Sequence, residues 1–218
     1  MPRIIDVLLS LLALLVLLPL FIPIIIILLL TGEHKVFYMQ NRVGFKNKNF
    51  KIIKFATMLS NSPNMGTGSL TLKNDPRVLP FGSFLRKTKI NELPQILNII
   101  KGDLCIVGPR PQMQVDFEKY SDDVKQKIYN VRPGLTGIGS IIFRDEESLP
   151  SAASENENPH EFYKRVIAPY KGELEMWYHE KRSIILDFQL IFMTAWVIVF
   201  PETRLYEKWF KDLPKRRF

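Results

Sequence analysis

The sequence predicts a helix-rich α+β protein that is held to a membrane near its N-terminus. A long uncharged apolar run, Val7 to Leu30, fills the beginning of the chain. After it, short apolar and aromatic segments separated by basic turns indicate strands, and apolar residues at three- and four-residue spacing indicate helices. The 218 residues suit one domain with a membrane element and are enough to bury a core.

Composition limits the classes of function without choosing one. The net charge of +8 suits nucleic acid, anionic lipid or phosphorylated substrates about equally well. The single cysteine, Cys105, excludes an internal disulfide and a cysteine-cluster metal site, and its apolar surroundings predict a small buried side chain. His34, His160 and His179 lack the spacing of metal ligands, so we expect no histidine metal site.

The apolar run at the start has two readings. As a helix, its 24 residues would be about 36 Å long, enough for a hydrocarbon core of about 30 Å. A cleaved signal peptide is the first alternative, but residues 30–33 offer no convincing cleavage site. Pro19 and Pro23 should each break a backbone hydrogen bond and bend the helix. The run is therefore either a bent transmembrane helix or a re-entrant helix that leaves the membrane on the face where it entered.

Extended segments come next. Residues 36–39 and 50–53 are predicted strands on either side of a basic turn at 41–46. Residues 59–74 are rich in Ser, Asn, Gly and Thr and predict a mobile loop, either a lid or a plain surface loop. An Asp75-Pro76-Arg77 turn follows this loop.

The stretch from Leu85 to Pro111, LRKTKINELPQILNIIKGDLCIVGPRP, is the most informative part of the chain. A basic turn leads into Asn91 and Glu92, and Pro94 fits the first turn of a helix. Apolar residues from Leu93 to Ile100 predict a short amphipathic helix that begins at Asn91 and Glu92. Because a helix start favours anions and two cationic segments flank it, the stretch predicts a cradle for phosphate.

The segments after Pro111 alternate helices and turns. Residues 113–130 predict a polar helix, and residues 131–137 predict a sharp turn that contains Arg132. This arginine either holds a phosphate or stabilises its own turn. Residues 144–160 are acidic and predict a solvated loop.

The C-terminal part is apolar again. Residues 161–182 predict a helix broken by Pro169 and Gly172. Residues 183–200 are marginal for crossing a membrane, and Asp187 within them favours an interfacial helix that lies along the bilayer. A core helix is the alternative. The aromatic and basic residues beyond it are typical of the headgroup region of anionic membranes.

Taken together, these motifs resemble the signature of the bacterial sugar transferases, the monotopic phosphoglycosyl transferases of the polyprenyl-phosphate type. That family carries a basic segment, an Asp-Glu-Leu-Pro-Gln motif, a Lys-Gly-Asp turn and a Gly-Pro-Arg-Pro motif in this order. Its other motifs match residues 40–44, 54–58, 75–77 and 132–137.

This sequence departs from the family pattern at four positions. Asn91 stands where the family has the Asp assigned as covalent nucleophile. Ala56 stands where a basic residue is usual, Leu18 where a Ser commonly precedes the proline, and Ile138 where a Trp is frequent.

The resemblance implies a topology. It favours a proline-broken re-entrant helix with both ends on the cytoplasmic side. We therefore expect a membrane-inserted helix in residues 1–32, a cytosolic catalytic domain in 33–182, and interfacial helices in 183–218 that belong to the same domain. The expected location is the bacterial inner membrane, with the catalytic domain facing the cytoplasm.

The resemblance also implies a reaction, the transfer of a sugar-1-phosphate from a UDP-sugar to undecaprenyl phosphate with release of UMP. This reaction would be the first membrane step of glycoconjugate or polysaccharide synthesis. Asn91 and Glu92 form the expected catalytic pair, and Glu92 is also the candidate ligand for Mg²⁺. The candidate phosphate-binding residues are Arg86, Arg110, Arg132, Lys54 and Arg77.

Partners follow from the same reading. We expect anionic membrane lipids as partners in addition to the two substrates, and we leave a homodimer open. Nucleic acid is not expected, because the basic residues are not interleaved with an aromatic platform.

Asn91 leaves three alternatives, since an amide is a poor nucleophile with no anionic form near neutral pH. Glu92 or another acid such as Asp75 replaces the nucleophile, or the lipid phosphate attacks directly, or the chain is an inactive membrane-anchored scaffold or regulator. Asn91 and Ala56 favour the last alternative. The rest of the site is intact, and we therefore expect an active enzyme.

Overall fold

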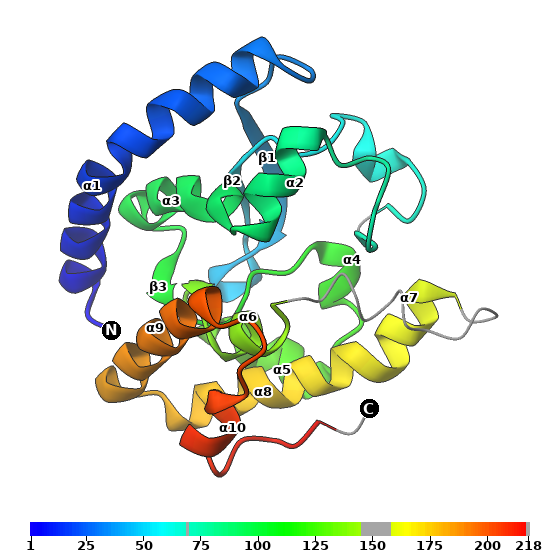
Figure 1. The fold of residues 1–218 in the computed structure, drawn as a ribbon. Helices are drawn as coiled ribbons and strands as arrows, with labels where there is room; N and C mark the ends of the chain where they lie inside the picture. Colours follow the sequence, from blue (N-terminus) through cyan, green and yellow to red (C-terminus); the bar gives the residue numbers. More distant parts are fainter. Residues whose placement is uncertain (69, 145–157, 217–218) are drawn as a thin grey trace.

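The computed structural model describes residues 1–68, 70–144 and 158–216, and it has the predicted helix-rich α+β character. Its first element is the long helix α1 (Arg3–Leu30), which curves along one side of the molecule (Figure 1). Pro19 and Pro23 lie inside α1, and the helix continues through both. By length and composition α1 could cross a membrane.

Both ends of α1 contact the same folded body. Near its start, Arg3 donates hydrogen bonds to the carbonyl oxygens of Ile99 (2.5 Å) and Ile100 (3.0 Å), and Asp6 accepts one from the backbone N–H of Ile106 (3.1 Å). Toward its end, one face packs into a small apolar cluster that consists of Phe21, Ile24, Leu28, Phe55 and Leu85. The helix therefore lies along the body over most of its length.

The two predicted strands are confirmed and are longer than expected. β1 (Phe37–Val43) and β2 (Asn49–Phe55) form an antiparallel hairpin. Asn98 joins this hairpin to the following helix, because its amide donates to the Lys51 carbonyl (2.8 Å) and accepts from the Ile53 N–H (2.9 Å). β2 is thereby fixed against the segment that carries Asn91 and Glu92.

The predicted helix start at Asn91 is wrong. Residues Ile90–Gln95 form a 3₁₀ helix, η3, and the α-helix α3 (Ile96–Lys101) begins only after it. Lys89, just before η3, has a left-handed backbone (φ 60°), and Pro94 inside η3 has no N–H to bond into a preceding α turn. Asn91 and Glu92 therefore lie in a tight 3₁₀ turn, and a helix dipole does not explain an anion site there.

A second, parallel strand pair joins two motifs that are distant in sequence. β3 (Cys105–Val107) pairs with β4 (Gly134–Thr136), so that the Gly-Pro-Arg-Pro segment meets the turn at 131–137. A Cβ atom on Gly134 would lie 2.1 Å from the backbone nitrogen of Gly108. Only glycine allows this close approach of the two backbones.

The rest of the described structure is mainly helical. Its helices are α2 (Pro80–Lys87), α4 (Gln114–Phe117), α5 (Asp122–Lys127), α6 (Ile138–Ile142), α7 (Pro159–Phe162), α8 (Ala168–Lys181), α9 (Ile184–Val199) and α10 (Leu205–Trp209), with a π-helical turn at Tyr163–Ile167 and 3₁₀ turns at Phe45–Asn47, Ser62–Asn64 and Ile128–Asn130. The single helix predicted over 113–130 is wrong, because the extended backbone at Ser121 separates α4 from α5.

The predicted break at Pro169 and Gly172 is also wrong. Pro169 lies in the first turn of α8, directly after the π-helical turn Tyr163–Ile167, and the helical path continues through it. Gly172 continues the helix and packs against Val124, which a Cβ at this position would meet at 3.2 Å.

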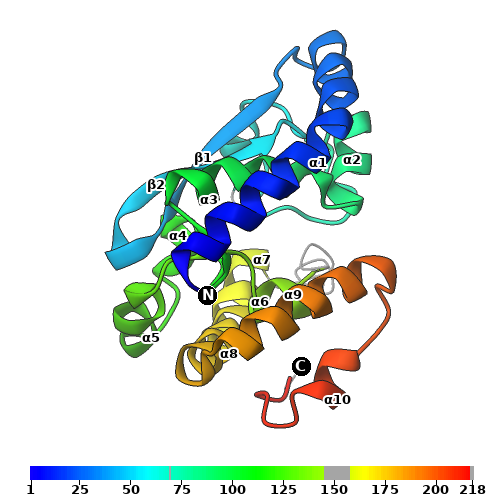
Figure 2. The same cartoon turned by 90° about the vertical axis from the view of Figure 1, so that its left-hand side faces the viewer.

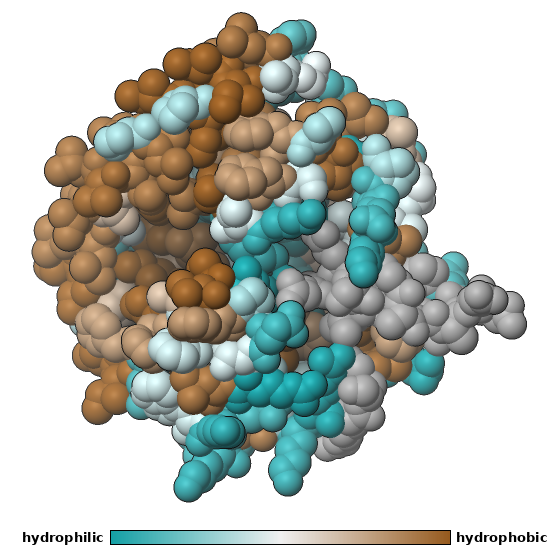
Figure 3. All heavy atoms as spheres, in the orientation of Figure 1, coloured by the Kyte–Doolittle hydropathy of each residue, from teal (hydrophilic) through white to brown (hydrophobic). Residues whose placement is uncertain are grey.

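Helix α9 is half core and half exposed apolar surface. Leu190 and Met193 on its inner face are fully buried, whereas Ile185 and Val199 on its outer face are 72% and 66% exposed. Asp187 points inward and accepts a hydrogen bond from the Tyr178 hydroxyl (2.7 Å), so its charge is kept away from the outer face. In Figure 2, α1 and α9 lie on the same side of the molecule, and the apolar surface of α1 is visible at the upper left of Figure 3.

The loop predicted at 59–74 is wound around Arg77. The guanidinium donates to backbone carbonyl oxygens of Ser62, Met65, Gly68 and Leu70 at 2.6 to 2.9 Å. It also pairs with the carboxylate of Asp75. Arg77 is only 4% exposed, so it serves as the centre of this loop.

Replacement of Arg77 by alanine should therefore lower the free energy of unfolding by about 3 kcal/mol, because four carbonyl oxygens and a buried carboxylate lose their donor. Urea unfolding of detergent-solubilised protein, followed by tryptophan fluorescence, measures this loss. The control is Arg204→Ala, which removes only an exposed pair with Glu207 at 3.9 Å. Equal losses in both variants would contradict the role of Arg77.

Candidate active site

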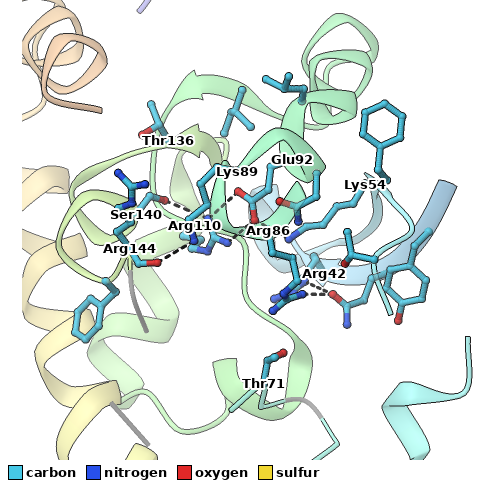
Figure 4. Close-up of a pocket in the computed structure, with 18 of the residues that line it drawn as sticks. Arg42, Lys54, Thr71, Arg86, Lys89, Glu92, Arg110, Thr136, Ser140 and Arg144 are labelled. Carbon is cyan, nitrogen blue, oxygen red and sulfur yellow. Dashed lines mark hydrogen bonds and ion pairs between the residues drawn. The ribbon is translucent and has the colours of Figure 1, made fainter. Parts of the chain in front are cut away.

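A pocket with a volume of about 510 Å³ lies beside η3 (Figure 4). Six cationic side chains line it, namely Arg42, Lys54, Arg86, Lys89, Arg110 and Arg144. Two carboxylates, Glu92 and Asp116, also line it. The lining thus carries an excess of four positive charges, which suits a ligand with several negative charges.

Glu92 pairs with two of these cations, Lys54 and Arg110. Its Oε1 atom accepts from Lys54 Nζ and from Arg110 Nη2, both at 2.9 Å, and Arg110 Nη1 lies 3.4 Å from Oε2. In Figure 4 the two cations approach Glu92 from opposite sides. Burial alone would raise the pKa of Glu92, but Arg110 and Lys54 hold it well below its usual range. Glu92 is therefore ionised at neutral pH.

The backbone explains why these side chains converge. Lys54 extends from β2, Glu92 from η3, and Arg110 from the segment after β3. Burial lowers the pKa of Lys54 to about 8, against the opposing effect of Glu92. The pKa of Lys54 is thus close to neutral pH, and a bound anion would favour its protonated form.

Asn91 lines the same pocket and is 5% exposed. Its amide oxygen is buried and has no hydrogen-bond partner among the residues described. A buried acceptor without a donor is unusual and costs free energy. The Asn91 amide oxygen therefore makes no hydrogen bond that would stabilise the fold.

The structure brings together five of the predicted site residues, Asn91, Glu92, Lys54, Arg86 and Arg110. Arg132 does not join them, because it is exposed at a second pocket. Arg77 does not line the pocket either, since its guanidinium is used inside the loop, and its partner Asp75 is likewise absent from the lining.

Sequence reasoning missed three cations of the pocket as site residues. Arg42, which lies within a matched family motif, donates to Gln40 Oε1 (Nε, 3.0 Å) and to the Pro111 carbonyl (3.3 Å). Lys89 lies in the basic turn before Asn91, and its Nζ donates to the Arg144 carbonyl (2.8 Å). No sequence pattern pointed to Arg144 as a site residue, because it borders the acidic stretch at 144–160. Most of that stretch lies outside the described residues.

The pocket fits Mg²⁺ only as an ion shared with a substrate. Among the described residues no three acidic, histidine or cysteine side chains gather as metal ligands. Glu92 Oε2 has one long contact and keeps room for another partner. One carboxylate together with phosphate oxygens and water is a common Mg²⁺ environment.

One wall of the pocket is apolar and comes from α9. Ile191, Ala195 and Ile198 line it from this helix, and Ile198 is also 44% exposed. The outer face of α9 belongs to the exposed apolar side of the molecule. The pocket therefore connects a cationic floor with an apolar surface.

Glu175 of α8 lies directly behind Arg110. Its Oε1 accepts the backbone N–H of Arg110 (3.2 Å), and its Oε2 is buried without a partner among the described residues. Burial raises the pKa of Glu175 to about 7. The folded protein thus keeps this proton up to about pH 7, whereas an unfolded glutamate releases it near pH 4.5.

The stability due to this proton is present below pH 4.5 and is lost as the pH rises toward 7. From pH 5 to pH 8, wild type should therefore lose about 3 kcal/mol of unfolding free energy more than Glu175→Gln does. Urea unfolding at both pH values measures the difference. Glu180→Gln, an exposed glutamate of the same helix, should behave as wild type. Parallel pH profiles for wild type and Glu175→Gln would contradict the assignment.

The site thus has the features of one that takes a phosphorylated amphiphile: a cationic floor, an apolar wall and an apolar side of the molecule next to it. The chain belongs to the bacterial sugar transferase family, whose model matches residues 1–201. This confirms the resemblance that the motifs indicated.

Individual relatives are similar over most of the chain. An exopolysaccharide production protein, ExoY, of Sinorhizobium fredii is 37% identical over 157 residues, which are 66% of this chain and 69% of that protein. A UDP-glucose:undecaprenyl-phosphate glucose-1-phosphate transferase of Xanthomonas campestris pv. campestris is 33% identical over 194 residues, 87% of this chain and 37% of the relative. An undecaprenyl-phosphate galactose phosphotransferase of Salmonella typhimurium is 31% identical over 176 residues, 74% of this chain and 33% of the relative. The last two relatives are much longer than the part they share with this chain.

Proposed function

We propose that the protein transfers a sugar-1-phosphate from a UDP-sugar to undecaprenyl phosphate and releases UMP. The observation that carries this proposal is the pocket that six cations and Glu92 line beside the apolar wall from α9. Both substrates are phosphorylated, and one of them has a lipid tail. The names of the relatives, which are undecaprenyl-phosphate sugar phosphotransferases, support the same reaction.

In this reaction the cations hold two anionic reactants together. Arg42, Arg86 and Arg110 are suited to phosphate oxygens, because a guanidinium pairs two oxygens at once and keeps its charge. The excess of four positive charges offsets the combined charge of a diphosphate and a lipid phosphate. Without such an excess the two anions would repel each other.

The lipid phosphate attacks directly in our proposal. One of its oxygens bonds to the phosphorus that carries the sugar, the bond from this phosphorus to the bridging oxygen breaks, and UMP leaves with that oxygen. Glu92 Oε1 accepts from both Lys54 and Arg110, and Asp116 is paired with Lys119 (2.9 Å), so we assign the attack to the lipid phosphate rather than to a carboxylate. Asn91 cannot form an acyl phosphate.

Glu92 has two roles in this scheme. It orients Lys54 and Arg110 for the phosphates, and its Oε2 would hold a Mg²⁺ ion that arrives with the nucleotide. The ion supplies further neutralisation of the diphosphate charge when bound.

The proposed topology is re-entrant, with the body on the cytoplasmic face of the bacterial inner membrane. The contacts of both ends of α1 with one folded body support it, because a straight spanning helix would carry one end away. Anionic lipids would surround its exposed apolar side. Labelling of a Pro2→Cys, Cys105→Ser variant tests the topology, and labelling from the periplasmic side would exclude it.

The activity test is UMP release by purified protein in nanodiscs with a panel of UDP-sugars, Mg²⁺ and undecaprenyl phosphate. The proposal expects release that depends on both the sugar nucleotide and the lipid phosphate. Asn91 favours one competing function, a catalytically inactive scaffold with the same fold. The absence of release with every sugar would establish that alternative for the chain as written.

A further inference from the structure

A second pocket, of about 150 Å³, lies apart from the main one and shares no lining residue with it. Its lining includes the beginning of α1, the turn around Arg132, and Arg182, which follows α8 and is separated from α9 by Ser183. Neither the proposed reaction nor the family motifs account for Arg182. The pocket is therefore a separate feature of the fold.

The charges at this pocket are not balanced. Arg3 is occupied by backbone carbonyl oxygens of α3, and the one carboxylate in the lining, Asp6, accepts a backbone N–H. Arg132 and Arg182 are exposed, and neither has an ion pair within residues 1–68, 70–144 and 158–216. The pocket thus presents two arginines with no counter-ion.

The surroundings of the two arginines are compatible with anion binding. The Arg132 guanidinium lies 5.4 Å from the centre of the Phe45 ring, a contact that orients the side chain and leaves its charge intact. Cys105 also lines the pocket, and burial raises its pKa to about 12, so its thiol stays neutral. Neither group adds negative charge that would compete with a ligand.

Exposed apolar side chains lie close in sequence to the lining residues Arg3, Asp6 and Arg182. Ile4 and Leu8 of α1 are 73% and 62% exposed, and Ile184 and Ile185 of α9 are 51% and 72% exposed. Figure 2 shows the beginnings of α1 and α9 on the same side of the molecule. The two arginines therefore lie where charged side chains would meet lipid headgroups if the apolar helices face the bilayer.

We propose that Arg132 and Arg182 form a binding site for the headgroup phosphate of an anionic phospholipid. A free phosphate offers the same charge, but it would leave the exposed isoleucines and leucine at the beginnings of α1 and α9 without a partner, whereas acyl chains would cover them. The site reassigns Arg132, which sequence reasoning had placed among the residues that bind the substrate phosphates. It would fix the beginnings of α1 and α9 at one depth in the membrane.

The test uses the full chain in a neutral detergent and follows the thermal unfolding midpoint during titration with dihexanoyl phosphatidylglycerol. Dihexanoyl phosphatidylcholine and inorganic phosphate are titrated in parallel. The variant is Arg132→Gln with Arg182→Gln. The control, Lys127→Gln with Lys164→Gln, removes the same charge from exposed residues outside the pocket.

We expect phosphatidylglycerol to raise the midpoint of wild type and control with equal apparent affinity, and the double arginine variant to bind it at least about tenfold more weakly. An equal response of the arginine variant would overturn the site. A similar response to phosphatidylcholine would overturn the preference for an anionic headgroup. An equal response to inorganic phosphate would overturn the lipid as ligand. None of these readouts depends on UDP-sugar turnover, so failure here is distinct from failure of the proposed function.

Discussion

Replacement of Glu92 by glutamine should lower UMP release by about 100- to 1,000-fold, the usual effect of removing one well-placed charged group from an active site. Glutamine has nearly the same shape, but it cannot neutralise Lys54 and Arg110, which meet at Oε1 in the native site. The two cations would then repel each other and lose their orientation toward the phosphates. Steady-state UMP release in nanodiscs measures the effect.

Two further variants separate chemistry from folding. Glu118→Gln removes an exposed carboxylate that only accepts from Gln114 (3.0 Å), and its activity should equal that of wild type. Glu92→Asp keeps the charge and should recover part of the lost rate. If Glu92→Gln retained near-normal turnover while remaining folded by thermal unfolding, Glu92 would have no part in the reaction.

The parts of the fold that could be predicted are those where local pattern and tertiary packing agree. The apolar run gave α1, and the two short apolar segments gave β1 and β2, because each pattern is continuous and bounded by turns. The errors at Asn91 and at Pro169 arose where a proline can either break a helix or occupy its first turn. Which of the two applies depends on the backbone before it, here the left-handed Lys89 and the π-helical turn before α8.

The site was predictable only where its residues share one stretch of sequence. Glu92, Arg86 and Arg110 come from the same motif-rich segment, whereas Arg144 is brought to the pocket by the parallel pairing of β3 with β4 and by α6, which no local pattern indicates. Arg77 and Arg132 lie in similar motifs, but Arg77 binds within its own loop and Arg132 lies at the second pocket. A motif indicates that an arginine matters, and only the tertiary contacts show what it binds.

In contrast to Glu92→Gln, replacement of Asn91 by aspartate should raise UMP release at least about tenfold. This is a gain of about 1.4 kcal/mol in transition-state stabilisation. The amide oxygen at this position is buried at the pocket and has no partner in the described structure. A carboxylate there would face a surplus of cations, which would keep it ionised and available for attack on phosphorus. Gln126→Glu, an exposed neutral-to-acidic change on α5, should leave the rate unchanged.

The lipid requirement discriminates between the two routes more sharply than the rate does. In wild type the lipid phosphate is the attacking group, so no UMP should form when undecaprenyl phosphate is omitted. In Asn91→Asp the carboxylate can attack first, so a burst of about one UMP per protein should appear without lipid. The sugar phosphate should then be bound to the protein as an acyl phosphate that is cleaved by alkali and by hydroxylamine. A lipid-independent burst in wild type would show that Glu92 or another carboxylate already acts as nucleophile and would refute direct transfer. A variant that gains neither rate nor burst would mean that position 91 does not face the reacting phosphorus, and the unpartnered amide would then need another explanation.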